Sequence, residues 1–175
     1  WFTRAVYYQQ FIKWAESIRK PAFPDLAIAG ISYVAKDNNT TAILKTNAIA
    51  YLAKKYPGKA IYIDVYATWC GPCIEEIKLS PPVHNAMEGK DIVFVNLCLA
   101  SEMDKWKTFI KERALDGENF FFNGDASQLF MGNYKLSGYP SYLLINKKGE
   151  IVTTTAPRPS DFDHLTKTLN KLAAE

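Results

Sequence analysis

Residues 60–73 read AIYIDVYATWCGPC, an apolar run that leads directly into two cysteines separated by a glycine and a proline. The part at 60–67 is typical of a buried strand, because most of its side chains are apolar or aromatic. Pro72 suits the first turn of a helix, where its missing N–H would have no partner in any case. The stretch therefore predicts a strand that passes into a helix at Cys70.

A cysteine at a helix N-terminus is reactive, because the unpaired backbone N–H groups there stabilise a thiolate over a thiol. In a Cys-X-X-Cys pair so placed, the pKa of the first thiol falls from about 8.5 to between roughly 3.5 and 7.5. The spacing also lets the second thiol attack a mixed disulfide formed by the first. The motif thus predicts redox chemistry on protein cysteines, carried out by Cys70 and Cys73.

The pair has two other interpretations, a structural disulfide and half of a zinc site. A structural zinc site normally has four protein ligands. The sequence has no second Cys-X-X-Cys and no histidine pair, since His84 and His164 stand alone. We therefore expect no metal and favour the redox interpretation.

Length and composition restrict the classes of function. The chain has 175 residues, 48% of them hydrophobic, which is enough for one domain with a full core and an extension. A net charge of +3, with basic residues scattered among acids, argues against a nucleic-acid partner. No apolar stretch approaches the roughly 18 residues of a membrane span. No leader precedes a cleavage site, and because the chain begins at Trp1 we expect any targeting segment to lie outside this sequence.

Residues 1–57 predict an N-terminal extension made mainly of helix. The expected elements are a helix at 1–19, a linker at 21–25, a strand at 31–35 closed by a turn at 37–39, and a helix within 41–56. The second helix is expected to end at Pro57-Gly58.

From residue 58 onward strands alternate with helices, which favours a sheet containing parallel strands. The expected order is strand 60–67, helix 72–87, strand 92–99, helix 103–114, short strand 120–122, helix 126–134, a hairpin of 141–145 with 150–154, and a final helix. Ser160 followed by Asp163 resembles a capping box that begins this last helix. Its buried face would consist of Phe162, Leu165, Leu169 and Leu172.

Several motifs of the second part occur together in one known superfamily. They are Ala67-Thr68-Trp69-Cys70 followed by Glu76, Trp106, Gly138-Tyr139-Pro140, and INKKG at 145–149. In this order they resemble the thioredoxin superfamily, and most of all its extracytoplasmic TlpA/ResA-like branch. The resemblance covers about 58–175 and implies an α/β, three-layer fold with a central mixed sheet flanked by helices. The extension at 1–57 would precede this domain.

The resemblance also implies roles for the site residues. Cys70 would be the exposed attacking thiol, Cys73 its resolving partner, and Pro140 a cis-proline facing them. Substrates would be disulfides of partner proteins, and electrons would come from a thiol donor such as a protein in the membrane. The redox-active Cys70–Cys73 disulfide would serve in place of a cofactor, and the protein would act outside the cytoplasm.

The chain departs from the family pattern at three places. Family members often have proline at the position of Lys78, so the usual kink of the active-site helix is expected to be absent or displaced toward Pro81-Pro82. Tyr139 is bulkier than the residue commonly found before the cis-proline, which would change the substrate groove. The branch usually opens with a hairpin, whereas 41–56 predicts a helix here.

Two acids are candidates for moving the proton of Cys73. Asp64 lies six residues before Cys70 in an apolar strand, where burial raises the pKa of a carboxyl, and thioredoxin has an acid at the matching position. Glu76 follows Cys73 by three residues on the same helical face and matches a glutamate of the branch. The other interpretations are a structural, hydrogen-bonded acid at 64 and an exposed helix residue at 76.

The residues around the pair predict a substrate surface. A cis-proline at 140 would present the backbone of Tyr139 as an edge to which an extended substrate pairs. Trp69, Gly71 and Pro72 would complete this contact surface next to the cysteines.

We therefore predict a thiol-disulfide oxidoreductase that exchanges disulfides with partner proteins. The Gly-Pro dipeptide between the cysteines, which thioredoxin shares, favours a reductant. The alternative is a binding module that keeps the fold without redox turnover. Cys98, at the end of a buried strand, is interpreted as a small core residue, with a regulatory bridge to Cys70 as the alternative.

Overall fold

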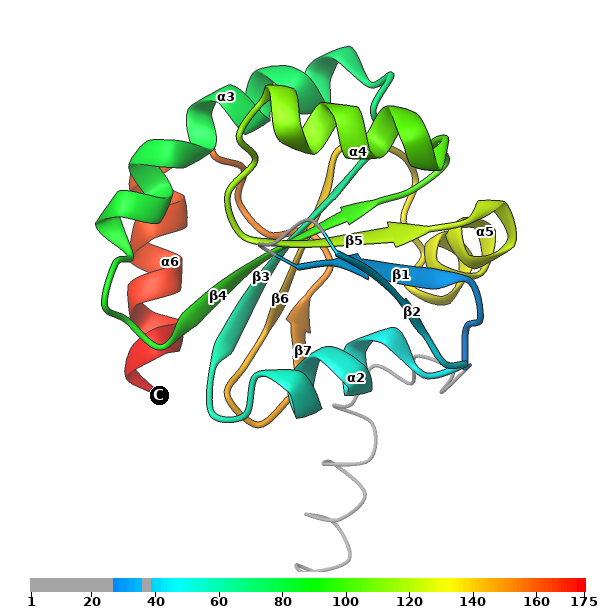
Figure 1. The fold of residues 1–175 in the computed structure, drawn as a ribbon. Helices are drawn as coiled ribbons and strands as arrows, with labels where there is room; N and C mark the ends of the chain where they lie inside the picture. Colours follow the sequence, from blue (N-terminus) through cyan, green and yellow to red (C-terminus); the bar gives the residue numbers. More distant parts are fainter. Residues whose placement is uncertain (1–26, 36–38) are drawn as a thin grey trace, which may run out of the picture.

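A mixed sheet forms the centre of the computed structural model, and helices cover both of its faces (Figure 1). The structure describes residues 27–35 and 39–175. The predicted helix at 1–19, the linker at 21–25 and the first two residues of the turn at 37–39 lie outside them. The elements are β1 (Ile31–Val34), β2 (Thr40–Ile43), α2 (Ala48–Lys55), β3 (Ala60–Tyr66), α3 (Gly71–Ala86), β4 (Ile92–Cys98), α4 (Met103–Glu112), β5 (Glu118–Phe122), α5 (Gly124–Asn133), β6 (Ser141–Ile145), β7 (Ile151–Thr153) and α6 (Phe162–Ala174).

The seven described strands lie in the order β2-β1-β5-β4-β3-β6-β7. β4 is parallel to both of its neighbours, β3 and β5, while β6 is antiparallel to β3 and β1 is antiparallel to β5. Parallel neighbours end at the same edge of the sheet, so the chain leaves β3 and β4 on one side. This edge carries Cys70 just after β3 and Cys98 at the end of β4.

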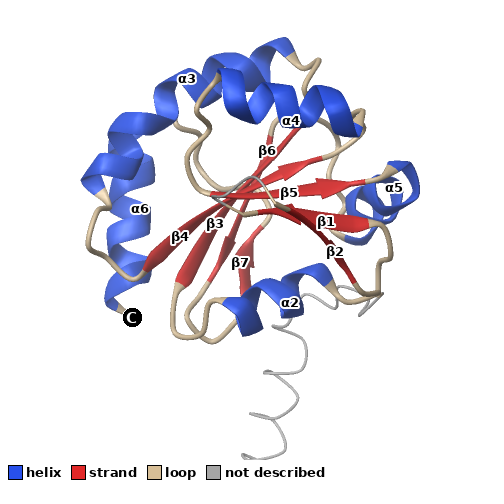
Figure 2. Ribbon diagram, in the orientation of Figure 1, coloured by secondary structure: helices blue, strands red, loops and turns tan. Residues whose placement is uncertain are grey.

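Three layers result from the alternation of side chains along β3, which is buried on both faces. Ile61, Ile63 and Val65 face one way and pack with α2 and α5. Tyr62 and Tyr66 face the other way. Tyr62 packs with α3 and α6, and Tyr66 packs with α3 and α4. Figure 2 shows these two helical layers on either side of the strands. The expected three-layer α/β fold with a central mixed sheet is confirmed.

The first strands form a hairpin, so the expectation that this hairpin is missing is wrong. β1 and β2 pair antiparallel from Val34 with Thr40 to Ile31 with Ile43, and β1 continues the sheet through β5. The expected second helix is present, but it begins only at Ala48, where the side chain of Asn47 caps it. β2 is a short edge strand with three exposed residues, and it therefore shows little of the alternation by which a strand is recognised.

The capping box predicted at Ser160 is also wrong. The Ser160 side chain donates to Glu76 of α3 instead, and α6 begins at Phe162 after Asp161. Phe162 is 40% exposed, in contrast to the prediction, because the first turn of α6 projects beyond the core. Leu165, Leu169 and Leu172 are buried against β3 and α3, as predicted.

Helix α3 contains Pro81 and Pro82 within its span, and it bends along its length in Figure 1. A proline inside a helix lacks the N–H that would bond to the carbonyl four residues earlier. For Pro81 this is the carbonyl of Ile77, which accepts from the Ser80 hydroxyl at 2.8 Å. Lys78 lies on the surface, where its side chain pairs with Glu75 at 2.7 Å. The helix-breaking residues of α3 therefore stand at 81 and 82.

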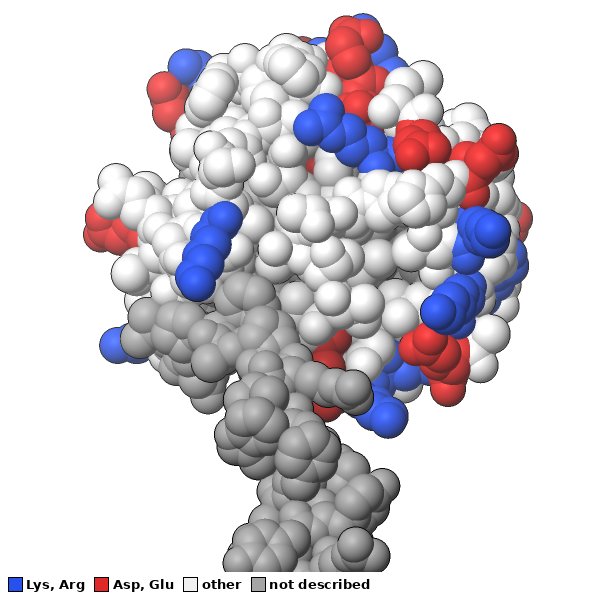
Figure 3. Space-filling model, turned by 180° about the vertical axis from the view of Figure 1, so that it is seen from behind, with Lys and Arg blue, Asp and Glu red and all other residues white. Residues whose placement is uncertain are grey.

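The surface carries charges of both signs. On the face shown in Figure 3, acidic and basic side chains lie near each other around the rim, and the centre is mostly uncharged. Among the helices of the described part, none has the length and apolar character required to cross a bilayer.

Candidate functional site

The two cysteines of the motif form a disulfide at the first turn of α3. Cys70 is the N-cap residue, its sulfur accepts from the backbone N–H of Cys73 at 3.2 Å, and Pro72 occupies the first turn. The sulfurs are bonded at 2.02 Å, with 5.3 Å between the Cα atoms. Strand β3 fixes this position, because it delivers the chain to the sheet edge only four residues before Cys70.

Cys70 is not the exposed thiol that the resemblance implied, since only 4% of it is accessible in this disulfide form. Its partner in the disulfide, Cys73, is fully buried. Gly71 and Pro72 are exposed, and Trp69 is 65% exposed. The disulfide therefore lies directly beneath the surface that a partner protein would contact.

Trp69 and the segment before β6 lie side by side. The Trp69 ring makes an edge contact with Tyr139 at 5.9 Å between centroids, and its indole N–H donates to the carbonyl of Ala100 at 2.7 Å. The peptide bond between Tyr139 and Pro140 is cis, and both residues are half-buried. The structure thus brings the predicted substrate residues together at one edge of the sheet.

Asp64 lies on the face of β3 that α3 covers, and it is only 7% exposed. In the sheet it is opposite Asn96 of β4 on one side and Tyr142 of β6 on the other. Burial, and secondarily the negative charge of Glu76, raises the pKa of Asp64 from 3.8 to about 8. Its Oδ1 atom has no hydrogen-bond partner among the described residues. The interpretation of Asp64 as a hydrogen-bonded structural acid therefore has no support at this atom.

Glu76 is not the exposed helix residue of the alternative interpretation, because it is 9% exposed. Both of its carboxylate oxygens accept from Ser160, one from the backbone N–H at 2.9 Å and one from the hydroxyl at 2.8 Å. Its neighbour Glu75 is exposed and pairs with Lys78. Glu76 thus fastens α3 to the segment before α6 and holds a carboxylate close enough to affect Asp64.

Cys98 is fully buried at the end of β4, opposite Tyr66. It belongs to the same apolar cluster as Cys70 and Cys73. Burial raises the pKa of the Cys98 thiol to about 11, although Ser101 and Tyr66 form hydrogen bonds with it. A thiol with this pKa is almost entirely protonated at neutral pH, which supports the interpretation as a core residue.

Ser101 and Ala100 support the site, although the sequence analysis did not identify them. The Ser101 hydroxyl oxygen lies 3.0 Å from the backbone N–H of Thr68 and 3.2 Å from its hydroxyl, and it donates to the carbonyl of Leu99. Ala100 has a φ of 48°, a left-handed conformation that is uncommon for alanine. The position of these two residues in the sequence could have identified them, because residues that follow β4 reach the same edge of the sheet as the cysteines.

We expect Ser101→Ala to destabilise the protein by about 1–3 kcal/mol, because the half-buried N–H of Thr68 loses its acceptor. Urea unfolding of the disulfide form measures this difference. Thr155→Ala, which removes an exposed hydroxyl bonded within its own turn, is the matched control and should change stability little. Equal stability of both variants and wild type would show that Ser101 does not hold the loop.

A mixed sheet between two helical layers, with a Cys-X-X-Cys disulfide where β3 passes into α3, defines a protein of the thioredoxin fold. The redoxin family profile matches residues 22–169. The chain therefore belongs to the redoxin family.

Individual relatives agree with this assignment. The thiol-disulfide oxidoreductase ResA of Bacillus thuringiensis (strain Al Hakam) is 28% identical over 100 residues, which cover 57% of this chain and 56% of the relative. Thioredoxin-1 of Caenorhabditis elegans is 33% identical over 91 residues, or 46% of this chain and 68% of the relative. The match thus spans about half the length of the ResA relatives.

Solved structures show the same fold. A Bacteroides vulgatus protein determined in solution superposes with a TM-score of 0.61 at 30% identity, covering 81% of this chain and 82% of that one. The thioredoxin domain of a thiol-disulfide oxidoreductase from the same species gives a TM-score of 0.63 at 19% identity, covering 84% and 96%. Within the described part of the chain, no group of three or more His, Cys, Asp or Glu side chains is placed to hold a metal ion.

Proposed function

We propose that this protein is a thiol-disulfide oxidoreductase that reduces disulfides in partner proteins. The observation that carries the proposal is the Cys70–Cys73 disulfide at the start of α3, beneath the exposed Trp69 and Gly71. This bond is the oxidised state of the pair, which thiol-disulfide exchange leaves in a protein that has reduced its partner and from which a protein can also oxidise one. The reducing direction rests on the Gly71-Pro72 dipeptide, which thioredoxin shares. The names of the ResA relatives support the same activity.

The reaction has two exchange steps. The thiolate of reduced Cys70 attacks one sulfur of the partner disulfide, that S–S bond breaks, and a mixed disulfide and one partner thiolate result. The sulfur of Cys73 then attacks Cys70 as its S–H proton leaves, and the mixed disulfide breaks. The partner departs with both sulfurs reduced, and the protein has lost two electrons to it.

Asp64 is proposed as the acceptor of the Cys73 proton. A carboxyl with a pKa of about 8 binds and releases a proton near neutral pH, as a general base must. Glu76 acts through Asp64 in this proposal, because its charge, fixed by Ser160, helps to keep that pKa high. Glu76 is therefore a positioning residue, and Asp64 the group that moves the proton.

The partner is proposed to bind over Trp69, Gly71 and Pro72, with an extended segment alongside Tyr139-Pro140. The exposure of the first three residues and the contact between Trp69 and Tyr139 support a continuous surface there. An extended peptide would form main-chain hydrogen bonds with the backbone of Tyr139, which lies in the bend just before β6.

After each turnover the Cys70–Cys73 disulfide must be reduced again. We propose that the electrons come from another thiol protein, such as one in the membrane. We also propose that the protein works outside the cytoplasm. Both proposals rest on the TlpA/ResA-like pattern of the sequence.

A Cys73→Ser variant is expected to accumulate a covalent complex with its substrate, because the mixed disulfide on Cys70 then has no resolving thiol. The reduced variant is mixed with insulin or a cell extract, quenched with acid and analysed on a non-reducing gel. The trapped complex should disappear on treatment with a reductant.

Wild type is the control in the same experiment and should show little complex, since Cys73 releases it. A Cys70→Ser, Cys73→Ser double variant should form none. If Cys73→Ser traps no partner and wild type reduces no disulfide, the protein is instead the redox-inactive binding module.

A further inference from the structure

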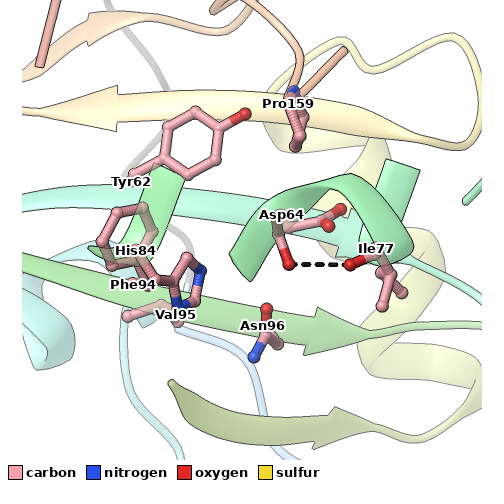
Figure 4. A pocket seen from close by; sticks show the side chains of 9 residues that line it. Tyr62, Asp64, Ile77, His84, Phe94, Val95, Asn96 and Pro159 are labelled. Carbon is pink, nitrogen blue, oxygen red and sulfur yellow. Dashed lines mark hydrogen bonds between the residues drawn. The ribbon is translucent and has the colours of Figure 1, made fainter. Parts of the chain in front are cut away.

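A small cavity lies next to Asp64, between α3 and the sheet (Figure 4). Its volume of about 10 Å³ is close to the space that one water molecule needs. The lining comes from β3, α3, β4 and the segment before α6, and consists of Tyr62, Asp64, Ile77, Ser80, His84, Phe94, Val95, Asn96 and Pro159. Asp64 lines this cavity, and its buried Oδ1 atom has no hydrogen-bond partner among the described residues.

Two further residues of the lining, Asn96 and Ser80, carry oxygens that can accept a hydrogen bond from a water in this cavity. The side-chain nitrogen of Asn96 donates to the carbonyl of Asp116 at 2.7 Å and to Oδ1 of Asn119 at 3.2 Å, which uses both of its N–H groups. The amide oxygen of Asn96 therefore remains on the cavity side, and Figure 4 shows it pointing toward Asp64. The Ser80 hydroxyl donates to the carbonyl of Ile77 at 2.8 Å, and its oxygen can still accept.

His84 closes the outer side of the cavity. Its side chain is 13% exposed, and the ring is stacked on Phe94 with 3.9 Å between centroids. Nδ1 lies 2.9 Å from Oδ2 of Asp116, whose other oxygen accepts from the backbone N–H of Gly117. Since a carboxylate only accepts, Nδ1 carries the hydrogen, and in the neutral ring Nε2 is left as the acceptor.

We propose that Asp64 exchanges its proton with solvent through this cavity, with His84 as the group that carries the proton out. The proposal rests on the proposed function, in which Asp64 takes the proton of Cys73. A water in the cavity accepts the proton of the Asp64 carboxyl and gives one of its own to Nε2 of His84. The imidazolium keeps its bond to Asp116 and then loses a proton to a base in solution, so that Asp64 is ionised again.

The other ionisable groups near Asp64 are unsuited to this task. Those that face it or its surroundings are Glu76, Tyr62, Tyr66, Tyr142 and Arg158. Burial raises the pKa of all three tyrosines far above neutral, and both oxygens of Glu76 are occupied by Ser160. An arginine remains charged in proteins. Of the residues that line the cavity, His84 is thus the one, besides Asp64, whose side chain can take up a proton at one atom and release one from another.

The test is a single turnover of reduced protein with excess insulin, in which acid quenching shows how fast the mixed disulfide forms and decays. Asp64, whose pKa is about 8, is mostly protonated at pH 7 and must release this proton before it can accept that of Cys73. In a dilute buffer of low basicity at pH 7, His84→Ala should therefore slow the decay of the mixed disulfide about threefold or more and leave its formation unchanged. Added imidazole should restore the decay, whereas pyrazole, a ring of the same shape that is not a base at this pH, should not. Wild type should respond to neither compound.

His164→Ala is the matched control, because His164 is exposed and bonded to Asp161 within α6's first turn. The mixed disulfide of this variant should decay at the wild-type rate. Unchanged decay in His84→Ala, or a slower decay that imidazole does not restore or that pyrazole restores equally, would overturn the route through His84. If Asp64→Asn slows the decay in that case, the proposed role of Asp64 stands without the route; if Asp64→Asn has no effect, that role itself fails.

Discussion

The Cys70→Ser variant is expected to lose reduction of insulin disulfides by roughly 10³-fold or more, the scale observed when an enzyme loses its nucleophile. A serine hydroxyl is not ionised at neutral pH and forms no disulfide, so neither exchange step can begin. The N-cap position of Cys70 makes the loss specific, because serine is also a good N-cap and preserves the start of α3. Insulin turbidity with dithiothreitol as electron donor measures the rate.

Cys98→Ala is the matched control for this experiment. Cys98 is buried, and the pKa of its thiol is about 11, so it offers little thiolate to a disulfide. We expect this variant to retain most of the wild-type rate. If Cys98→Ala lost activity and Cys70→Ser kept it, the reactive thiol would have been assigned to the wrong residue.

The fold and the cysteine pair could be predicted because their signals are local. The apolar strand at 60–66, Pro72 in the first turn and the two-residue spacing of the cysteines lie within one short stretch. The burial of Asp64 and its raised pKa could be predicted for the same reason, since an acid inside an apolar strand stands out from its neighbours. The structure adds that its Oδ1 lacks a partner, which no sequence pattern reports.

The errors have long-range or conformational causes. Ser160 has the residue type and spacing of a helix cap, but its partner Glu76 is 84 positions away in the chain. Residues 41–43 were predicted to lie in a helical region because an exposed edge strand buries no regular face. The exposure of Cys70 was misjudged because its burial depends on packing against distant residues such as Cys98 and Trp106. The cavity beside Asp64 combines four separate segments, and only the structure brings them together.

Asp64 should also control how the stability of the protein depends on pH. The ordinary pKa of 3.8 rises to about 8 when Asp64 is buried, so between these values the folded protein holds a proton that the unfolded chain has released. Stability that is present at low pH is therefore lost as the pH rises through this window, by up to about 1.4 kcal/mol per pH unit. Asparagine has no such proton to lose. Relative to wild type, Asp64→Asn should gain unfolding free energy steadily from pH 4 to pH 8.

Urea unfolding of the disulfide form at several pH values measures this difference, in which the contributions of all other groups cancel. Glu75→Gln is the matched control, because Glu75 is exposed, and its curve of stability against pH should run parallel to that of wild type.

In the reduced protein, Asp64→Asn should slow decay of the mixed disulfide by roughly 10²-fold at neutral pH, the usual contribution of a general base. If Asp64→Asn is more stable than wild type but its mixed disulfide decays at the wild-type rate, Asp64 is a buried acid with no role in the reaction. Parallel stability curves for wild type and Asp64→Asn would show instead that Asp64 is ionised in the folded protein, and its function as acceptor of the Cys73 proton near neutral pH would then fail.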